Sequence, residues 1–195
     1  MIKRIKLIHV YGAILTLAIA LIANACYMQS KAWLAQVLIN QSWQESMAKG
    51  ERIRPWPWSD TWPVSRLIMP QHQVDLILLA GDDGRTLAFG PGVRLSAALP
   101  GQAGVSMISA HRDTYFEFLE NVKIGESFTI QNTQGKYLRY RITATEIIDQ
   151  PVLHTPLSTK TPQIVFVTCY PFHALTSGGP QRYIVYAELE KSTLI

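Results

Sequence analysis

Cys169 is the side chain of this sequence best suited to nucleophilic chemistry. It follows the apolar run Ile164–Val167 and precedes Tyr170-Pro171, so a buried strand would end at the thiol. Proline does not continue a central strand, which places the cysteine at the end of a sheet, beside a loop that a substrate can reach. The alternative is an inert buried thiol, the commonest fate of a lone cysteine.

A thiolate nucleophile needs a proton partner and a nearby positive charge. His111 follows the β-favouring segment Val105–Ala110, so its position mirrors that of Cys169. Arg182 opens the last β-favouring segment, and its permanently charged guanidinium has a fork of donors that suits an oxyanion. Each residue also has an ordinary explanation, as a solvated histidine or an arginine in a surface ion pair. We take His111, Cys169 and Arg182 as the candidate catalytic residues.

Short β-favouring segments must position these residues. They are Val64–Met69, Val74–Ala80, Val105–Ala110, Ser127–Gln131, Tyr137–Ile148, Ile164–Cys169 and Tyr183–Leu189. Turn signals rich in glycine separate them, as in Gly81–Gly84 and Gly90–Gly92. One helical turn is expected at Thr114–Glu120, because Thr114 and Glu117 have the spacing of a capping box. Seven or eight short strands with so little helix predict a closed or nearly closed β-barrel.

The chain begins with a basic cluster and an apolar segment. Residues 7–27 carry no formal charge and follow Lys3, Arg4 and Lys6. At about 1.5 Å per residue this segment is long enough to cross a bilayer, and the positive-inside rule places the N-terminus in the cytoplasm. A signal peptide cleaved after Ala23-Asn24-Ala25, or a lipoprotein site at Cys26, are the alternatives. All three interpretations export the rest of the chain.

A helix and an aromatic segment connect this anchor to the body. Lys31–Lys49 has helical periodicity, with Trp33, Leu34, Val37, Leu38 and Gln41 on roughly one face. We expect that face to pack on the domain, with an interfacial helix on the membrane as the alternative. Glu51–Pro63 contains three prolines and three tryptophans, which favour an extended segment packed on the domain. A lid over an active site is the minority interpretation.

Composition excludes several functions. The chain has 195 residues, 16% of them charged, which is too apolar for a disordered protein. The net charge of +4 includes the three basic residues before Leu7, and from Leu7 onward it is 15 minus 14, or +1. Nucleic-acid binding is therefore a poor hypothesis. Two cysteines and no C-x-x-C pair exclude a disulfide framework and a thiol redox motif.

In their local contexts these residues resemble the sortases, a family of membrane-anchored cysteine transpeptidases, and most closely those of Gram-negative bacteria. The resemblance runs from Trp62 to Leu189 and rests on four segments: Phe89-Gly90-Pro91-Gly92, ISAHRDTYFEFL around His111, VTCYPF around Cys169 and QRYIVYAEL beginning beside Arg182. The spacings agree as well, with 58 residues from His111 to Cys169 and 13 more to Arg182.

The resemblance implies an eight-stranded barrel and a division of the chain. Residues 1–6 would be a cytoplasmic tail, 7–27 a transmembrane anchor, 28–61 a helical and Pro/Trp-rich neck, and 62–195 the catalytic barrel on the exported side of the inner membrane. The resemblance also implies an exported protein substrate with a C-terminal LPxTG-like sorting signal and an amine acceptor of unknown identity. No cofactor, metal or nucleic acid is implied.

The resemblance also implies a role for each site residue. Cys169 would attack the Thr–Gly bond and form a thioacyl enzyme, while His111 would act as general acid and then as base. Arg182 would hold the oxyanion, and Thr168 would line the substrate groove. The Asp-Pro-aromatic lid of pilus-building members is absent, since Trp58–Trp62 matches it only loosely, and no cluster of acids suggests a calcium site.

Three other classes of function stay open at this point. An L,D-transpeptidase also pairs an exported cysteine with a histidine, but its usual Ser-x-Gly-Cys-x-Arg segment is not found around Cys169. A zinc site could use Cys169, His173 and either His111 or His154, although Arg182 would oppose a cation. A membrane-tethered, non-catalytic β module that binds a partner through its aromatic neck is the third.

Overall fold

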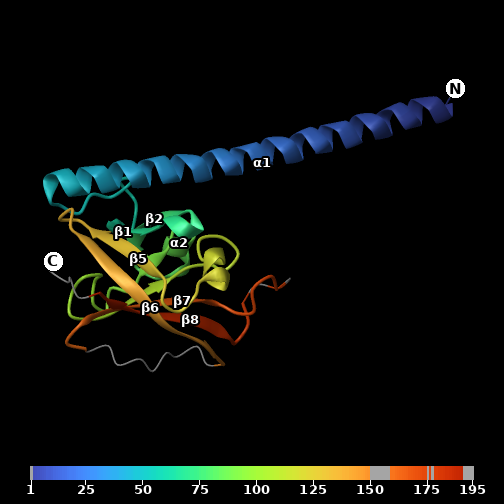
Figure 1. The fold of residues 1–195 in the computed structure, drawn as a ribbon. Helices are drawn as coiled ribbons and strands as arrows, with labels where there is room; N and C mark the ends of the chain where they lie inside the picture. Colours follow the sequence, from blue (N-terminus) through green and yellow to red (C-terminus); the bar gives the residue numbers. More distant parts are fainter. Residues whose placement is uncertain (1, 150–158, 175, 177, 191–195) are drawn as a thin grey trace. The chain divides into compact units, whose positions relative to one another are not determined.

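The computed structural model describes residues 2–149, 159–174, 176 and 178–190 (Figure 1). The chain divides into two compact units, residues 1–37 and 38–195. The long helix α1 runs from Ile2 to Lys49. Its part up to residue 37 forms the first unit, and its remaining turns belong to the second. From Val10 to Met28 its large apolar side chains are exposed. By length and composition α1 is the one helix among the described residues that could cross a membrane.

The last turns of α1 belong to the second unit. Ile39 and Trp43 are buried there, with Ser42 and Ser46 on the same face. The Ser42 hydroxyl donates to the carbonyl of Ile53, whose N–H donates in turn to the Ser46 hydroxyl. These hydrogen bonds join the segment after α1, at Ile53, to the last turns of the helix. Within the second unit the expected packing face was wrong, because Gln41 is exposed and Leu38 only half-buried, whereas Ile39 and Trp43 are buried.

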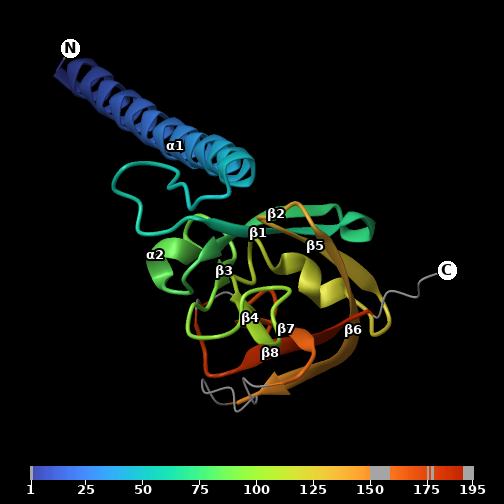
Figure 2. The ribbon, with the colours of Figure 1, turned by 90° about the vertical axis from the view of Figure 1, so that its left-hand side faces the viewer.

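The second unit is a closed barrel of eight strands, which confirms the predicted fold. The strands are β1 (Pro63–Met69), β2 (Val74–Ala80), β3 (Gly92–Val93), β4 (Gly104–Ser109), β5 (Ser127–Asn132), β6 (Tyr137–Ile148), β7 (Pro162–Cys169) and β8 (Arg182–Leu189). Their order around the barrel is β1-β2-β3-β4-β7-β8-β6-β5. The β1–β2 hairpin therefore lies across the barrel from β7 and β8 (Figure 2). All pairs are antiparallel except β2 with β3 and β4 with β7.

Three short elements differ from the sequence-based expectation. The Gly90–Gly92 turn runs into the two-residue strand β3, and the Gly81–Gly84 turn runs into the helix α2, Gly84–Leu87, capped by the Asp83 carboxylate. The helical turn after β4 is a 3-10 helix, η2, at Glu117–Asn121. Its N-cap is Phe116 and no side chain caps it, so the Thr114–Glu117 capping box was wrong. A second 3-10 helix, η1, covers Pro70–His72.

The barrel has an inner core and a smaller outer apolar cluster. Ile164 and Phe166 of β7 point into the main core, while Val165 belongs to the outer cluster with Val105 and Ile184. The strand is therefore apolar on both faces, as its continuous apolar run predicts. This alternation decides which face each neighbouring side chain occupies.

The neck packs on the end of β2. The Thr61 hydroxyl donates to the carbonyl of Ala80, and the N–H of Ala80 donates to the carbonyl of Trp62. The ring of Trp56 packs edge to face on the ring of Phe89, with the two ring centroids 5.0 Å apart. These contacts give Trp56 a packing role, whereas Trp58 is 80% exposed, so the expected packing of the tryptophans is only partly right.

Candidate active site

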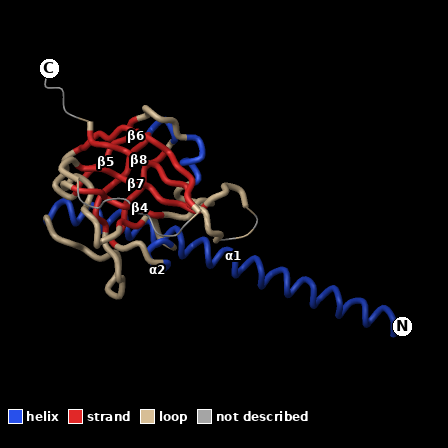
Figure 3. Tube along the Cα trace, turned by 90° about the horizontal axis from the view of Figure 1, so that it is seen from below, coloured by secondary structure: helices blue, strands red, loops and turns tan. Residues whose placement is uncertain are grey.

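Cys169 and Arg182 are opposite residues of two neighbouring strands. Cys169 is the last residue of β7, Arg182 is the first of β8, and the antiparallel register pairs them directly. On its other side Arg182 pairs with Ile148 of β6. Figure 3 shows β6, β8, β7 and β4 side by side in that order.

His111 follows the strand on the other side of β7. The parallel register of β4 and β7 matches Ser109 with Val167. The N–H of Ala110 then donates to the carbonyl of Val167, so the pairing continues past the last residue of β4. Two residues further along each strand, His111 is level with Cys169. The backbones of all three candidate residues therefore reach the same end of the barrel.

Strand alternation puts the three positions on the outer face. Cys169 is two residues after Val167, and Arg182 is two before Ile184; both neighbours belong to the outer cluster. Ala110, just before His111, belongs to the inner core, and Val105, six residues before His111, belongs to the outer cluster. Cys169 and Arg182 are thus neighbours on the outer face of β7 and β8, and extending the β4–β7 register two residues past Ser109 places His111 on the other side of Cys169.

The three side chains differ in exposure and in partners. His111 is exposed, whereas Cys169 and Arg182 are half-buried. The Arg182 guanidinium donates from Nη1 to the carbonyls of Gly179 and Gln181, at 2.6 and 2.8 Å. It is thus held by the loop before its own strand. Among the described residues no hydrogen bond joins the His111 ring to Cys169, and catalytic hydrogen bonds often tighten only when substrate is bound.

Thr168 lies on the inner face of β7. Its side chain is buried, and its hydroxyl donates to the carbonyl of Ala110 at 2.8 Å. This bond ties β7 to the residue immediately before His111. A role for Thr168 in lining the substrate groove stays a prediction, because in this structure the hydroxyl serves a strand-to-strand contact.

Arg112 is a feature that the sequence analysis passed over. Its side chain is 2% exposed, and its Nη2 donates to the carbonyls of Ala174 and Thr176, at 3.3 and 2.6 Å. Both carbonyls belong to the loop between Cys169 and Arg182. A second contact to this loop joins His173 Nε2 and Glu120 Oε2 at 2.7 Å. The sequence signal for Arg112 was its position next to His111.

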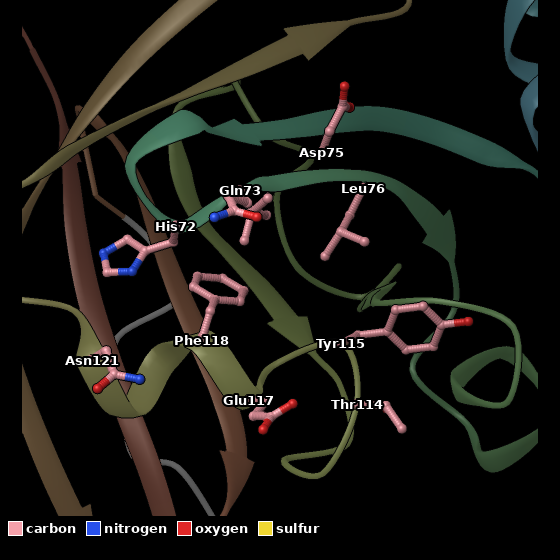
Figure 4. A pocket seen from close by; sticks show the side chains of 10 residues that line it. His72, Gln73, Asp75, Leu76, Thr114, Tyr115, Glu117, Phe118 and Asn121 are labelled. Carbon is pink, nitrogen blue, oxygen red and sulfur yellow. The ribbon is translucent and has the colours of Figure 1, made fainter.

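An open pocket of about 500 Å³ lies elsewhere on the barrel. Its walls come from the start of β2 and from the segment after β4, with Leu76, Tyr115 and Phe118 around the space (Figure 4). Its histidine, His72, lies 2.7 Å from the carboxylate of Glu126. Within the described residues its lining includes neither cysteine nor any of the three candidate catalytic residues. We therefore place the candidate active site at the strand ends.

The zinc hypothesis gains no support from the geometry. No group of three or more potential metal ligands is found among the described residues. His173 Nε2 lies 2.7 Å from Glu120 Oε2. His154 falls outside the described residues.

Comparison with known proteins identifies the family. The Sortase domain model matches residues 67–190, well over half of the chain, and the chain belongs to the sortase family. Sortase D of Bacillus subtilis is 28% identical over 123 residues, which span 63% of this chain and 61% of that relative. The chain thus matches less than two thirds of the relative's length.

Solved sortase structures share the fold. A lid mutant of sortase A from Corynebacterium diphtheriae superimposes with a TM-score of 0.60 at 25% identity, over 69% of this chain and 73% of that one. The sortase D5 transpeptidase of Clostridium perfringens gives a TM-score of 0.64 at 18% identity, over 81% and 99% of the two chains. At 18% identity, the similarity to the Clostridium perfringens enzyme concerns the fold alone. A particular likeness to sortases of Gram-negative bacteria stays a prediction.

Proposed function

We propose that this protein is a cysteine transpeptidase that cleaves an LPxTG-like sorting signal of exported proteins and transfers the acyl group to an amine. Membership of the sortase family supports the reaction class. The observation that carries the proposal is the direct pairing of Cys169 with Arg182, with His111 continuing the adjacent parallel strand at the same level.

In the first half-reaction the Cys169 thiolate attacks the carbonyl carbon of the Thr–Gly bond. The carbonyl oxygen becomes an oxyanion, to which the Arg182 guanidinium donates. Arg182 keeps the hydrogen bonds of Nη1 to the Gly179 and Gln181 carbonyls, and Nη2 or Nε donates to the oxyanion. The oxyanion then collapses, the C–N bond breaks, and protonated His111 gives a proton to the leaving glycine amine. A thioester on Cys169 remains.

In the second half-reaction the roles of acid and base are reversed. Neutral His111 takes a proton from the incoming amine, whose nitrogen attacks the thioester carbon. The second tetrahedral oxyanion is held by Arg182 in the same way. Its collapse forms the new amide and expels Cys169 as a thiolate, with His111 protonated again. Proton count and charge are thus the same before and after one turnover.

We place the anchor in the inner membrane, with the barrel on the exported side. The long exposed apolar face of α1 is compatible with a single-pass anchor. The basic residues Lys3, Arg4 and Lys6 favour a cytoplasmic N-terminus. An exported substrate would then meet the barrel after crossing the same membrane.

A pentapeptide panel tests this function. The purified protein is incubated with LPxTG-like peptides varied at each position, and products are measured by mass spectrometry with and without hydroxylamine or glycine amide. We expect cleavage after threonine and faster turnover with the amine, because it captures the thioester. Products formed only from a D-amino-acid peptidoglycan stem would move the assignment to an L,D-transpeptidase. Binding without any cleavage would support the non-catalytic module.

A further inference from the structure

The loop between β7 and β8 connects two residues of the proposed active site. It begins after Cys169 and ends before Arg182. Its carbonyls at Gly179 and Gln181 hold the Arg182 guanidinium. The position of this loop therefore sets where the guanidinium rests relative to the paired thiol.

Arg112 binds the described part of the same loop from the turn that follows β4. Its Nη2 donates to the carbonyls of Ala174 and Thr176, and its Nε donates to the Asp113 carboxylate at 3.1 Å. Asp113 is 59% exposed, whereas the Arg112 side chain is 2% exposed. The charge is therefore buried mainly against loop backbone. Nη2 reaches both loop carbonyls while Nε bonds Asp113, and a lysine ammonium has no second nitrogen for the latter bond.

The environment of Arg112 is costly for folding stability. Burying a guanidinium removes its hydration, and its third nitrogen, Nη1, is buried without a hydrogen-bond partner among the residues that the structure describes. A buried apolar residue of similar volume is often no less stabilising than a buried ion. Such local costs are typical of functional sites, because the arrangement there serves activity.

We propose that Arg112 is a positioning residue that fixes the β7–β8 loop and through it the Arg182 guanidinium. The effect of Arg112 on turnover rests on the proposed function, whereas its effect on the loop does not. Arg112 directly follows His111, so the segment after β4 that carries the histidine also orients the loop that holds Arg182. The Glu120–His173 contact is a second, more exposed attachment of that loop.

The test compares Arg112→Met and Arg112→Lys with Arg139→Met, in which an exposed arginine paired with Glu190 is removed. Amide hydrogen exchange of the full-length protein in detergent is measured by mass spectrometry. We expect faster exchange in the peptide spanning residues 170–181 of Arg112→Met, a smaller change in Arg112→Lys and none in Arg139→Met. Unchanged exchange in this peptide for Arg112→Met would overturn the proposal, and this readout needs no substrate.

Kinetics test the link to Arg182. A misplaced catalytic group costs up to about 100-fold, so Arg112→Met is expected to lower kcat by about 10- to 100-fold with little change in KM. Arg112→Lys is expected to recover part of this loss. In an Arg182→Ala background the same substitution should have no further effect, because the two act through one interaction. Losses that multiply in the double variant would overturn the link.

The two arms separate the possible failures. If the wild-type protein forms no acyl product, the proposed function fails while the exchange arm still decides whether Arg112 holds the loop. If Arg112→Met does not fold, Arg112→Lys is measured by both arms in its place. His173→Ala, which removes only the second attachment, is expected to raise exchange in the loop less than Arg112→Met does.

Discussion

At the scale of single residues, Thr168 and Arg112 are the groups that hold the three proposed catalytic positions together. Thr168 joins β7 to the carbonyl before His111, and Arg112 joins the residue after His111 to the loop that follows Cys169. Both bonds run between segments that are far apart in the sequence. The proposed site is thus connected by buried polar contacts beside it as well as by strand pairing.

Replacing Thr168 with valine tests the first of these bonds. The shape is kept, but the buried Ala110 carbonyl loses its donor, so the free energy of unfolding should fall by about 1–2 kcal/mol. Thr143→Val removes an exposed hydroxyl that bonds to the carbonyl of Tyr186 and should change stability by less than about 0.5 kcal/mol. Urea unfolding measures both. Equal stabilities of the two variants would show that the Thr168 bond contributes nothing specific.

The pattern of residue types indicated the three proposed site positions but not the contacts around them. Cys169, His111 and Arg182 were recognisable because each stands at the end of an apolar segment. The bonds of Thr168 and Arg112 span 58 to 64 residues and depend on the parallel pairing of β4 with β7. Such a pairing cannot be inferred from local periodicity. The Arg182 contacts are with carbonyls only one and three residues away, but they depend on the loop conformation, which residue types alone do not define.

At the scale of elements, close backbone approach explains β3, which the sequence analysis took for a turn. A Cβ atom at Gly92 would lie 2.1 Å from the carbonyl oxygen of Gly81. Glycine therefore lets β3 reach β2 and close the barrel. The long strands were predictable because alternation and turn signals are local, whereas a two-residue strand leaves too few positions for any period.

Gly92→Ala is expected to destabilise the barrel by about 3 kcal/mol, because backbone must move to make room for the methyl group. Gly84→Ala is the matched control, since a Cβ there meets nothing within 4 Å and lies in the helix α2. That substitution should be neutral or slightly stabilising. Thermal unfolding monitored by circular dichroism compares them, and a Gly92→Ala variant as stable as wild type would contradict the packing.

The β5–β6 pair contributes a group whose ionisation is coupled to folding. Tyr140 is fully buried, stacks on Phe128 at 5.6 Å and accepts a hydrogen bond from the N–H of Gly101. Burial raises the pKa of Tyr140 to about 12, the Gly101 hydrogen bond opposing this weakly. The folded state therefore keeps a proton that the unfolded chain loses above its ordinary pKa of 10.0.

The unfolded state binds fewer protons than the folded state between pH 10 and 12. The free energy of unfolding should therefore fall as pH rises through this range, and the contribution of Tyr140 should be fully present below pH 10. The expected loss is about 2–3 kcal/mol across that range. Urea unfolding at several alkaline pH values measures it. Tyr140→Phe should lack this part of the pH dependence, whereas Tyr137→Phe, at an exposed position, should keep it. Identical pH profiles for wild type and Tyr140→Phe would contradict the coupling.

At the scale of the whole molecule, the proposed activity requires the barrel to be on the exported side. A long apolar helix compatible with an anchor was predictable from length and apolar content alone, because those quantities are local to the segment. The helix itself continues to Lys49, and its packing face in the second unit uses Ile39 and Trp43. That face was mispredicted because aromatic and apolar residues occur on several sides of this segment.

Labelling in spheroplasts tests the sidedness. In a Cys26→Ala background, Cys169 should react with a membrane-impermeant maleimide in intact spheroplasts, since it is half-buried rather than sealed. A cysteine introduced by Lys3→Cys in a background lacking both natural cysteines should react only after the membrane is permeabilised. The reverse pattern of labelling would place the barrel in the cytoplasm.

The central claim is that Cys169 carries the acyl group, and the direct measurement is the mass of the covalent intermediate. Full-length protein in detergent is quenched in acid during turnover of a sorting-signal peptide, digested and analysed by tandem mass spectrometry. We predict a thioacyl adduct on Cys169 in the wild type and in Cys26→Ala, sensitive to hydroxylamine, and none in Cys169→Ala although that variant folds. An adduct on another residue, or peptide cleavage that persists in Cys169→Ala, would contradict the account.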